Sequence, residues 1–218
     1  MKIATRMILG LTATLAFSAP ARAQDAGFYA GASLGQAKYR SCPGATVFSD
    51  PLRPPPSGCD GSDTAWRLFG GYRFNRHFSA ELGFADLGQA TGNLPPSNTN
   101  TTSTTGTLDT ETTAWDLTAI GALPLVERLS LIGKVGLYHA GIKNRSTRTT
   151  FFAGFISSSV VTDSSDNDSG VTFGVGAQYD FARHFGVRVE WQRYGKVGSA
   201  ATGEIDIDVL SAGLLYRF

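Results

Sequence analysis

The last ten residues of the chain alternate between apolar side chains and others. Counting back from Phe218, every second residue is apolar, whereas Arg217, Gly213 and Ser211 lie among the positions between. A period of two predicts a β-strand, because successive side chains of a strand point to opposite faces. A strand that ends a chain leaves an open edge unless it is paired. We therefore expect this strand to pair with the first one and to close a barrel.

The same alternation predicts seven further strands, and each of them has one apolar face without a charge. Eight is an even number, as in bacterial membrane barrels. The predicted fold class is all-β, an eight-stranded antiparallel transmembrane up-and-down β-barrel. The strands before the terminal one are predicted at residues 27–38, 64–74, 78–87, 113–123, 129–141, 170–181 and 185–192.

The connections between the predicted strands alternate strictly in length. Short periplasmic turns and long external loops are typical of outer-membrane barrels. The apolar core of the third loop, 151–156, is expected to extend its flanking strands as a hairpin. Long polar loops are predicted at residues 40–63, 88–112 and 142–169, and short turns at 75–77, 124–128 and 182–184.

An inside-out interpretation fits the same alternation. In a soluble barrel of the lipocalin type, the apolar face would line a ligand cavity and the charged face would meet water. The membrane interpretation is favoured because the aromatic residues concentrate at strand ends, as in interfacial girdles, and because the connections alternate in length. The soluble barrel remains the alternative.

The first 23 residues have the features of a cleaved signal peptide. Lys2 and Arg6 precede a short apolar run, and residues 21–23 have the small-x-small form of a cleavage site. We expect a signal peptide over 1–23 and one barrel domain over 24–218. The apolar run is too short for a membrane helix, and no other stretch reaches about 18 apolar residues.

Charge and cysteine content narrow the function classes. Without the three basic residues of the signal peptide, 16 basic residues stand against 18 acidic ones, a net charge of −2 that gives no indication of nucleic-acid binding. Cys42 and Cys59 in an exported chain predict a disulfide, with two free thiols as the alternative. The cysteines lack a C-x-x-C spacing and the three histidines are scattered, so we expect neither a metal site nor a cofactor.

The face opposite the apolar one carries charged residues. Glu81, Lys134, Arg188 and Glu190 are expected to point inward at a similar distance from the short turns. Two acids and two bases would neutralise each other, as buried charges require, and side chains fill an eight-stranded barrel. These four residues are the predicted lumen charge network. The same face carries Arg67, Arg73, Asp116 and Arg217.

Five stretches match a known family in order and spacing: 28–35 (FYAGASLG), 69–88 (FGGYRFNRHFSAELGFADLG), 117–124 (LTAIGALP), 178–192 (QYDFARHFGVRVEWQ) and the closing YRF. Together they resemble the OmpA-type transmembrane domain, within the small outer-membrane β-barrel proteins. The resemblance implies an eight-stranded barrel that is inserted by the outer-membrane assembly machinery. It also implies an assembly signal in the last strand, at Tyr216 and Phe218. Two-domain relatives continue into a peptidoglycan-binding domain, and we do not expect one here.

The resemblance also bears on gating. In OmpA-like barrels an internal Glu is thought to exchange basic partners, and Glu81 and Arg188 fall on matching positions. The position of the alternative basic partner in those barrels corresponds to Ile120 in this chain, and the position of a further acidic residue corresponds to Gln178. A partner-swapping gate is therefore not implied for this chain.

We expect an integral outer-membrane protein without enzymatic activity. A general base at the external rim could be supplied by a histidine there. Of the three histidines only His139 lies near the outer end of a predicted strand, and by parity its ring faces lipid. The expected role is structural, in envelope integrity, with at most a narrow, plugged lumen. The alternative is a surface adhesin or host-interaction barrel that binds a surface ligand through loops 40–63, 88–112 and 142–169. The expected partners are outer-membrane lipid and lipopolysaccharide, and the assembly machinery.

Overall fold

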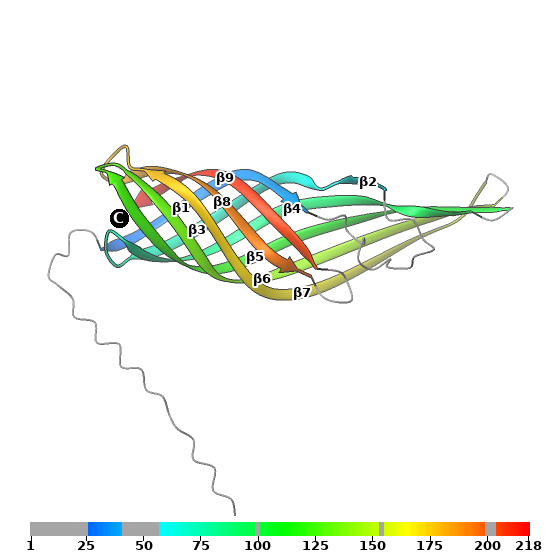
Figure 1. Cartoon of the computed structure of the whole chain (residues 1–218). Helices are drawn as coiled ribbons and strands as arrows, with labels where there is room; N and C mark the ends of the chain where they lie inside the picture. The colour runs from blue at the N-terminus through cyan, green and yellow to red at the C-terminus, as the bar shows by residue number, and fades with distance from the viewer. Residues whose placement is uncertain (1–25, 41–56, 99–100, 153–154, 199–203) are drawn as a thin grey trace, which may run out of the picture.

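The computed structural model describes residues 26–40, 57–98, 101–152, 155–198 and 204–218, which form nine strands (Figure 1). This part of the chain contains no helix capable of crossing a membrane. The strands are β1 (Gly27–Tyr39), β2 (Ser57–Asp60), β3 (Ser62–Arg73), β4 (Phe78–Asn98), β5 (Thr102–Val126), β6 (Leu129–Phe152), β7 (Phe155–Tyr179), β8 (Phe185–Val197) and β9 (Ile205–Arg217).

Eight of these strands close into a ring by antiparallel pairing. The order around the ring is β1, β3, β4, β5, β6, β7, β8 and β9, and β2 pairs with β4 outside it. The ring closes where β9 pairs with β1, from Tyr29 opposite Arg217 to Tyr39 opposite Ile207. The predicted eight-stranded antiparallel barrel is therefore confirmed, including the pairing of the terminal strand with the first.

The apolar face of the strands points out of the barrel. Leu34, Leu117 and Leu137 are 67%, 61% and 65% exposed, whereas the charged residues Glu81 and Lys134 on the opposite face are buried. A soluble barrel would place its apolar face inside. The lipocalin-type alternative is therefore wrong, and the apolar outer surface suits a lipid environment.

Aromatic side chains form two bands on the outer surface. The band near the short turns contains ring pairs such as Phe185 and Tyr216, whose centroids lie 5.1 Å apart. In the other band the ring of Phe84 lies 4.9 Å from that of Trp115. Such bands mark the two membrane–water interfaces. We call Trp66, Phe84, Trp115, Phe173 and Trp191 the outer girdle, and Phe28, Tyr72, Phe74, Phe78, Tyr179, Phe181, Phe185, Tyr216 and Phe218 the inner girdle.

Two of the predicted loops are strands. The hairpin expected around 151–156 is confirmed, since Phe151 and Phe152 of β6 pair with Ile156 and Phe155 of β7. The segment 88–112 belongs almost wholly to β4 and β5, and the segment 142–169 to β6 and β7. These strands have 21 to 25 residues, against 12 or 13 in β1, β3, β8 and β9. One wall of the barrel therefore continues far beyond the rest, as Figure 1 shows at the end opposite the C-terminus.

The polar composition of these segments explains the error. Strands beyond the membrane need no apolar face, so the alternation that reveals the other strands is absent there. Threonine is β-branched and favours strands whether or not it is buried. Polar side chains also pair across the strands: Thr104 Oγ1 lies 3.3 Å from Thr150 Oγ1, and Thr110 donates a hydrogen bond of 2.8 Å to Asn144.

The predicted loop 40–63 ends earlier than expected, because β2 and the start of β3 lie within it. Residues 1–25 and Cys42 lie outside the described residues. The signal peptide and the disulfide between Cys42 and Cys59 therefore stay predictions.

A short turn between β3 and β4 is fixed by one side chain. Asn75 Oδ1 accepts hydrogen bonds from the backbone N–H groups of His77 and Phe78, at 2.8 and 2.9 Å. This is the local bonding by which Asn stabilises turns. It allows Phe78 to begin β4 directly after the turn.

Gly136 on β6 allows a close approach to β5. A Cβ atom at this position would lie 2.0 Å from the carbonyl oxygen of Leu117 and 2.7 Å from Cα of Thr118. A Cβ atom on Gly133, in the same strand, would meet nothing within 4 Å. Only the first glycine is therefore required by packing.

We predict that Gly136→Ala destabilises the barrel by about 1–3 kcal/mol, since the added methyl group must displace backbone atoms of β5. The measurement is urea-induced unfolding in lipid vesicles, with Gly133→Ala as the matched control. Equal stability of the two variants would contradict the close packing of β5 and β6.

Candidate functional site

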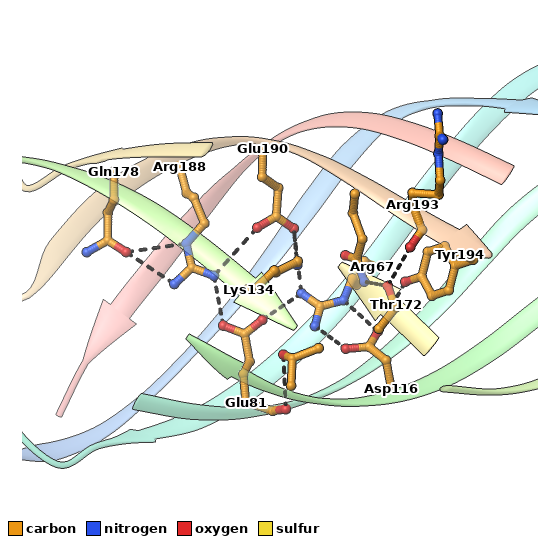
Figure 2. A network of polar contacts seen from close by, with 12 residues as sticks. Arg67, Glu81, Asp116, Lys134, Thr172, Gln178, Arg188, Glu190, Arg193 and Tyr194 are labelled. Carbon is orange, nitrogen blue, oxygen red and sulfur yellow. Dashed lines mark hydrogen bonds and ion pairs between the residues drawn. The ribbon is translucent and has the colours of Figure 1, made fainter. Parts of the chain in front are cut away.

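The middle of the barrel lumen is filled by paired charged side chains (Figure 2). Three are basic and three are acidic, and all six are buried. With neighbouring neutral side chains they come from every strand of the ring except β9. The lumen network consists of the charged residues Arg67, Glu81, Asp116, Lys134, Arg188 and Glu190, and the neutral residues Tyr29, Gln178 and Tyr194.

Glu81 on β4 lies at the centre of the lumen network and is 1% exposed. Its Oε1 accepts a hydrogen bond of 2.7 Å from Arg67, and its Oε2 accepts one of 2.7 Å from Arg188. The hydroxyl of Tyr29 also donates to Oε2, at 3.1 Å. One carboxylate thus joins β1, β3 and β8 to β4.

Arg67 on β3 forms the second part of the lumen network. Its Nε and Nη2 donate to the two carboxylate oxygens of Asp116, at 3.0 and 2.7 Å. This bidentate geometry is the strongest arrangement for a guanidinium and a carboxylate. The hydroxyl of Tyr194 donates to the same carboxylate at 3.1 Å.

Glu190 on β8 forms the third part. Lys134 Nζ donates to its Oε1 at 2.8 Å. The same carboxylate lies 3.8 Å from a guanidinium nitrogen of Arg67 and 3.8 Å from one of Arg188. The remaining donors of Arg188 reach Gln178 Oε1, at 3.3 and 3.1 Å. Each base therefore contacts at least one acid.

The ring of Phe69 lies close to two guanidinium groups of the network. Its ring centroid is 5.2 Å from Cζ of Arg67 and 4.9 Å from Cζ of Arg188. Cations over an aromatic face are attracted by the ring quadrupole. Phe69 therefore favours the same two cations that Glu81 joins.

The structure brings the four predicted residues together, and it adds Arg67 and Asp116, which were predicted to face inward but not to join the network. These two residues lie on β3 and β5, with β4 between them. On β4 they face Ala85 and Gly83, and a Cβ atom on Gly83 would lie 2.4 Å from the Arg67 guanidinium. A small inward residue between two strands with opposite charges is the sequence signal that could have indicated this pair.

Apolar side chains pack in the lumen between the network and the long strand ends. Tyr138 and Tyr194 meet there edge to face, with centroids 5.5 Å apart. We call this group the apolar plug. Its residues are Ala37, Tyr39, Ala65, Ala85, Leu87, Ala90, Ala114, Tyr138, Ala140, Ile142, Tyr194, Val197, Ile207 and Val209.

On the other side of the network, toward the short turns, the lumen opens into a polar vestibule of about 470 Å³. Its lining includes Arg73 and an ion pair between Arg217 and Asp180. Gln178 donates to Asp180 at 3.1 Å and so connects the vestibule to the network. The lumen is therefore open toward the short turns and filled by side chains beyond them.

Three further residues singled out in the sequence, Tyr216, Phe218 and His139, lie at the surface. Tyr216 and Phe218 belong to the inner girdle, and the Phe218 N–H donates to the carbonyl of Phe28 at 3.1 Å. Their role as an assembly signal stays a prediction. His139 is exposed, with Nδ1 2.8 Å from the hydroxyl of Ser169. Within the described ranges, no three His, Cys, Asp or Glu residues are close enough to hold a metal ion.

We predict that Glu81→Gln lowers the free energy of unfolding by about 3–5 kcal/mol, because it leaves two buried guanidinium groups without their shared carboxylate. Urea-induced unfolding in lipid vesicles measures the change. Glu127→Gln, in an exposed turn, is the matched control and should change stability little. A loss no larger than that of the control would show that Glu81 does not hold the network.

Comparisons with known proteins agree with this architecture. A family model, the outer membrane protein beta-barrel domain, matches residues 9–218. No curated protein matches the chain.

Several solved structures match this chain at low sequence identity, and the first two named here show the same fold. The N-terminal β-barrel domain of Pseudomonas aeruginosa OprF is 13% identical, with 89% of this chain and 100% of that one covered and a TM-score of 0.51. The outer membrane protein AlkL in DMPC bilayers is 15% identical, with 93% and 95% covered and a TM-score of 0.52. Ail, the attachment invasion locus protein of Yersinia pestis, is 15% identical, with 89% and 98% covered and a TM-score of 0.48. The match to the family model extends over nearly the whole sequence, so the chain is an outer-membrane protein that belongs to the outer membrane protein beta-barrel domain family.

Proposed function

We propose that this protein is a structural barrel that supports the integrity of the outer membrane and does not serve as a general solute channel. The lumen network is the observation that carries the proposal. Its three bases and three acids neutralise each other and span the lumen. An eight-stranded barrel leaves little room beyond its inward side chains.

The contacts across the lumen explain how such a barrel would resist deformation. Arg188 on β8 and Glu81 on β4 are separated by three strands in either direction around the ring, yet their side chains are 2.7 Å apart. A change in barrel cross-section would separate such pairs and leave buried charges unpaired, at a cost of several kcal/mol. The apolar plug adds a second filled layer.

A catalytic role finds no support in the position of His139. Its ring lies on the outer surface of β6, directly opposite Trp115 of the neighbouring strand β5. The ring contacts the hydroxyl of Ser169, and among the described residues it forms no hydrogen bond or ion pair with a carboxylate. An interfacial position is a sufficient explanation for this histidine.

A second candidate function, surface interaction, rests on the protruding wall of β4, β5, β6 and β7. Residues 155–169 of β7 pair with β6, whereas its pairing with β8 begins at Thr172 within the described residues. One edge of the wall therefore offers backbone groups to an extended segment of a partner. Its exposed apolar residues are Phe152, Phe155, Ile156, Val160 and Val161.

We predict that the refolded protein produces no large, steady conductance in planar lipid bilayers, because the lumen network and the apolar plug fill the path. Heat-modifiable gel migration should first show that the barrel is folded. A large, steady conductance from folded wild-type protein would overturn the proposal of a closed structural barrel.

A trimmed barrel separates the two candidate functions. Four residues form one row across β4, β5, β6 and β7: Asn93 lies opposite Thr107, Thr107 lies opposite Thr147, and Thr147 lies opposite Val161. In the trimmed barrel, Asn-Gly replaces residues 94–106 and a second Asn-Gly replaces residues 148–160. The two short turns then join Asn93 to Thr107 and Thr147 to Val161, which are directly opposed pairs, and Asn-Gly is the sequence that most favours such hairpin turns.

We predict that the trimmed barrel restores detergent resistance to a strain that lacks this protein as fully as the wild type does, because the membrane-spanning ring is unchanged. The measurement is growth in graded SDS, with equal outer-membrane levels as the control. Failure of the trimmed barrel to restore resistance, together with loss of cell adhesion, would favour the surface-interaction function instead.

A further inference from the structure

Basic side chains gather on the outer surface of β8, β9 and β1, just beyond the outer girdle. Arg193 follows Trp191 by two residues on β8, and Lys38 and Arg40 lie at the end of β1. Asp208 on β9 is the direct cross-strand partner of both Lys38 and Arg193. We call Lys38, Arg40, Arg193 and Asp208 the rim cluster.

Asp208 holds the two arginines in place. Arg193 donates to its two carboxylate oxygens from Nε and Nη2, at 2.6 and 3.0 Å, and Arg40 Nε donates at 2.7 Å. The Arg193 guanidinium also lies 5.2 Å from the ring of Trp191. Figure 2 shows the Arg193 side chain directed away from the lumen network. Three cations against one carboxylate leave the rim cluster with a net charge of +2.

The rim cluster keeps donors available to a ligand. The Arg40 side chain is 54% exposed, and only its Nε contacts Asp208. Lys38 is exposed and lies directly opposite Asp208, and within the described residues its ammonium group has no hydrogen-bond or ion-pair partner. An anion at this position would thus meet prearranged guanidinium and ammonium groups.

Among the described residues, the other walls have no such excess of positive charge at this level. On β4, Asp86 follows Phe84 of the outer girdle by two residues. On β5, Glu111 lies four residues beyond Trp115 and faces Lys143 of β6 directly. At this level, and among the residues that the structure describes, positive charge in excess of the neighbouring acids lies on the side of β8, β9 and β1.

Acidic residues closer to the loop end do not cancel the rim cluster. Asp206 accepts a hydrogen bond from the Lys196 N–H at 3.0 Å, and Glu204 lies 3.8 Å from Lys196 Nζ. Glu204 is thus paired with the Lys196 ammonium group, whereas Asp206 accepts a neutral backbone N–H and keeps its charge. The rim cluster together with Lys196, Glu204 and Asp206 carries four bases against three acids, so the positive charge of this region is reduced but not cancelled.

The position of the rim cluster identifies the class of anion. Two residues of a strand span about 7 Å, so Arg193 lies just beyond the interface that Trp191 marks. Leu34 and Leu210, on the same face nearer the membrane centre, are 67% and 60% exposed and suit acyl chains. The long strands extend on this side, which is the external side in outer-membrane barrels. The external leaflet consists of lipid A, whose phosphates lie directly above its acyl chains.

We propose that the rim cluster binds a phosphate group of lipid A. Asp208 positions the two arginines, Arg40 and Lys38 supply the accessible donors, and the apolar surface below contacts the acyl chains. The assignment goes beyond a structural role for the barrel, because it gives the outer wall a specific lipid ligand.

The test compares lipids that differ in one feature. Native mass spectrometry of the full-length mature barrel in detergent measures the apparent Kd for bisphosphorylated lipid A, for dephosphorylated lipid A and for phosphatidylglycerol. The wild type should bind bisphosphorylated lipid A about tenfold more tightly than the dephosphorylated form. Each basic residue near a membrane surface strengthens the binding of anionic lipid by a factor of about this order.

The double variant K38Q/R40Q should lose this preference, while K143Q should keep it, because Lys143 faces Glu111. Both variants alter exposed side chains, and unchanged heat-modifiable migration verifies their folding. Three results would overturn the proposal: equal wild-type binding of the two lipid A forms, an equal loss in K143Q, or binding of phosphatidylglycerol as tight as that of lipid A, which would indicate general attraction to anions.

Discussion

The shared carboxylate of Glu81 is the interaction on which the interior of this barrel depends. It accepts hydrogen bonds from Arg67 and Arg188, and these two guanidinium groups in turn reach Asp116, Glu190 and Gln178. Charges in a lumen of low dielectric constant are tolerated only when they are paired. The network satisfies this condition with three bases and three acids, so the interior can be polar while the membrane-facing surface is apolar.

The two surfaces of the barrel wall follow from one feature of the sequence, its alternation with a period of two. The same strands that direct Arg188 and Glu190 inward direct Val189 and Trp191 toward lipid. Closure of β9 on β1 removes the open edges that a membrane does not tolerate. Beyond the outer girdle the strands no longer contact lipid, so they need neither an apolar face nor a closed edge. There they are polar and unequal in length, and β7 has an open edge.

The sequence predicted the membrane-spanning ring more completely than it predicted the strand extensions beyond the membrane or the charge network inside the lumen. Alternation revealed all eight membrane strands, because lipid requires an apolar face on each. It did not reveal the polar parts of the extensions of β4 to β7, where Thr104 and Thr150 pair without any apolar face. The apolar run 151–156 did indicate the hairpin that joins β6 to β7. Four of the six charged network residues were identified by their distance from the turns. Arg67 and Asp116 were not, because their contact passes over Gly83 of the strand between them and depends on side-chain reach.

The central claim is that Glu81 and Arg188 support each other across the lumen, and a double-mutant cycle measures this coupling directly. Glu81→Gln, Arg188→Gln and the double variant would be unfolded in urea in lipid vesicles beside the wild type. A shared, buried charge pair predicts a coupling free energy of about 2 kcal/mol or more. Additive effects, with a coupling below about 0.5 kcal/mol, would contradict the account of a barrel held closed by its lumen network.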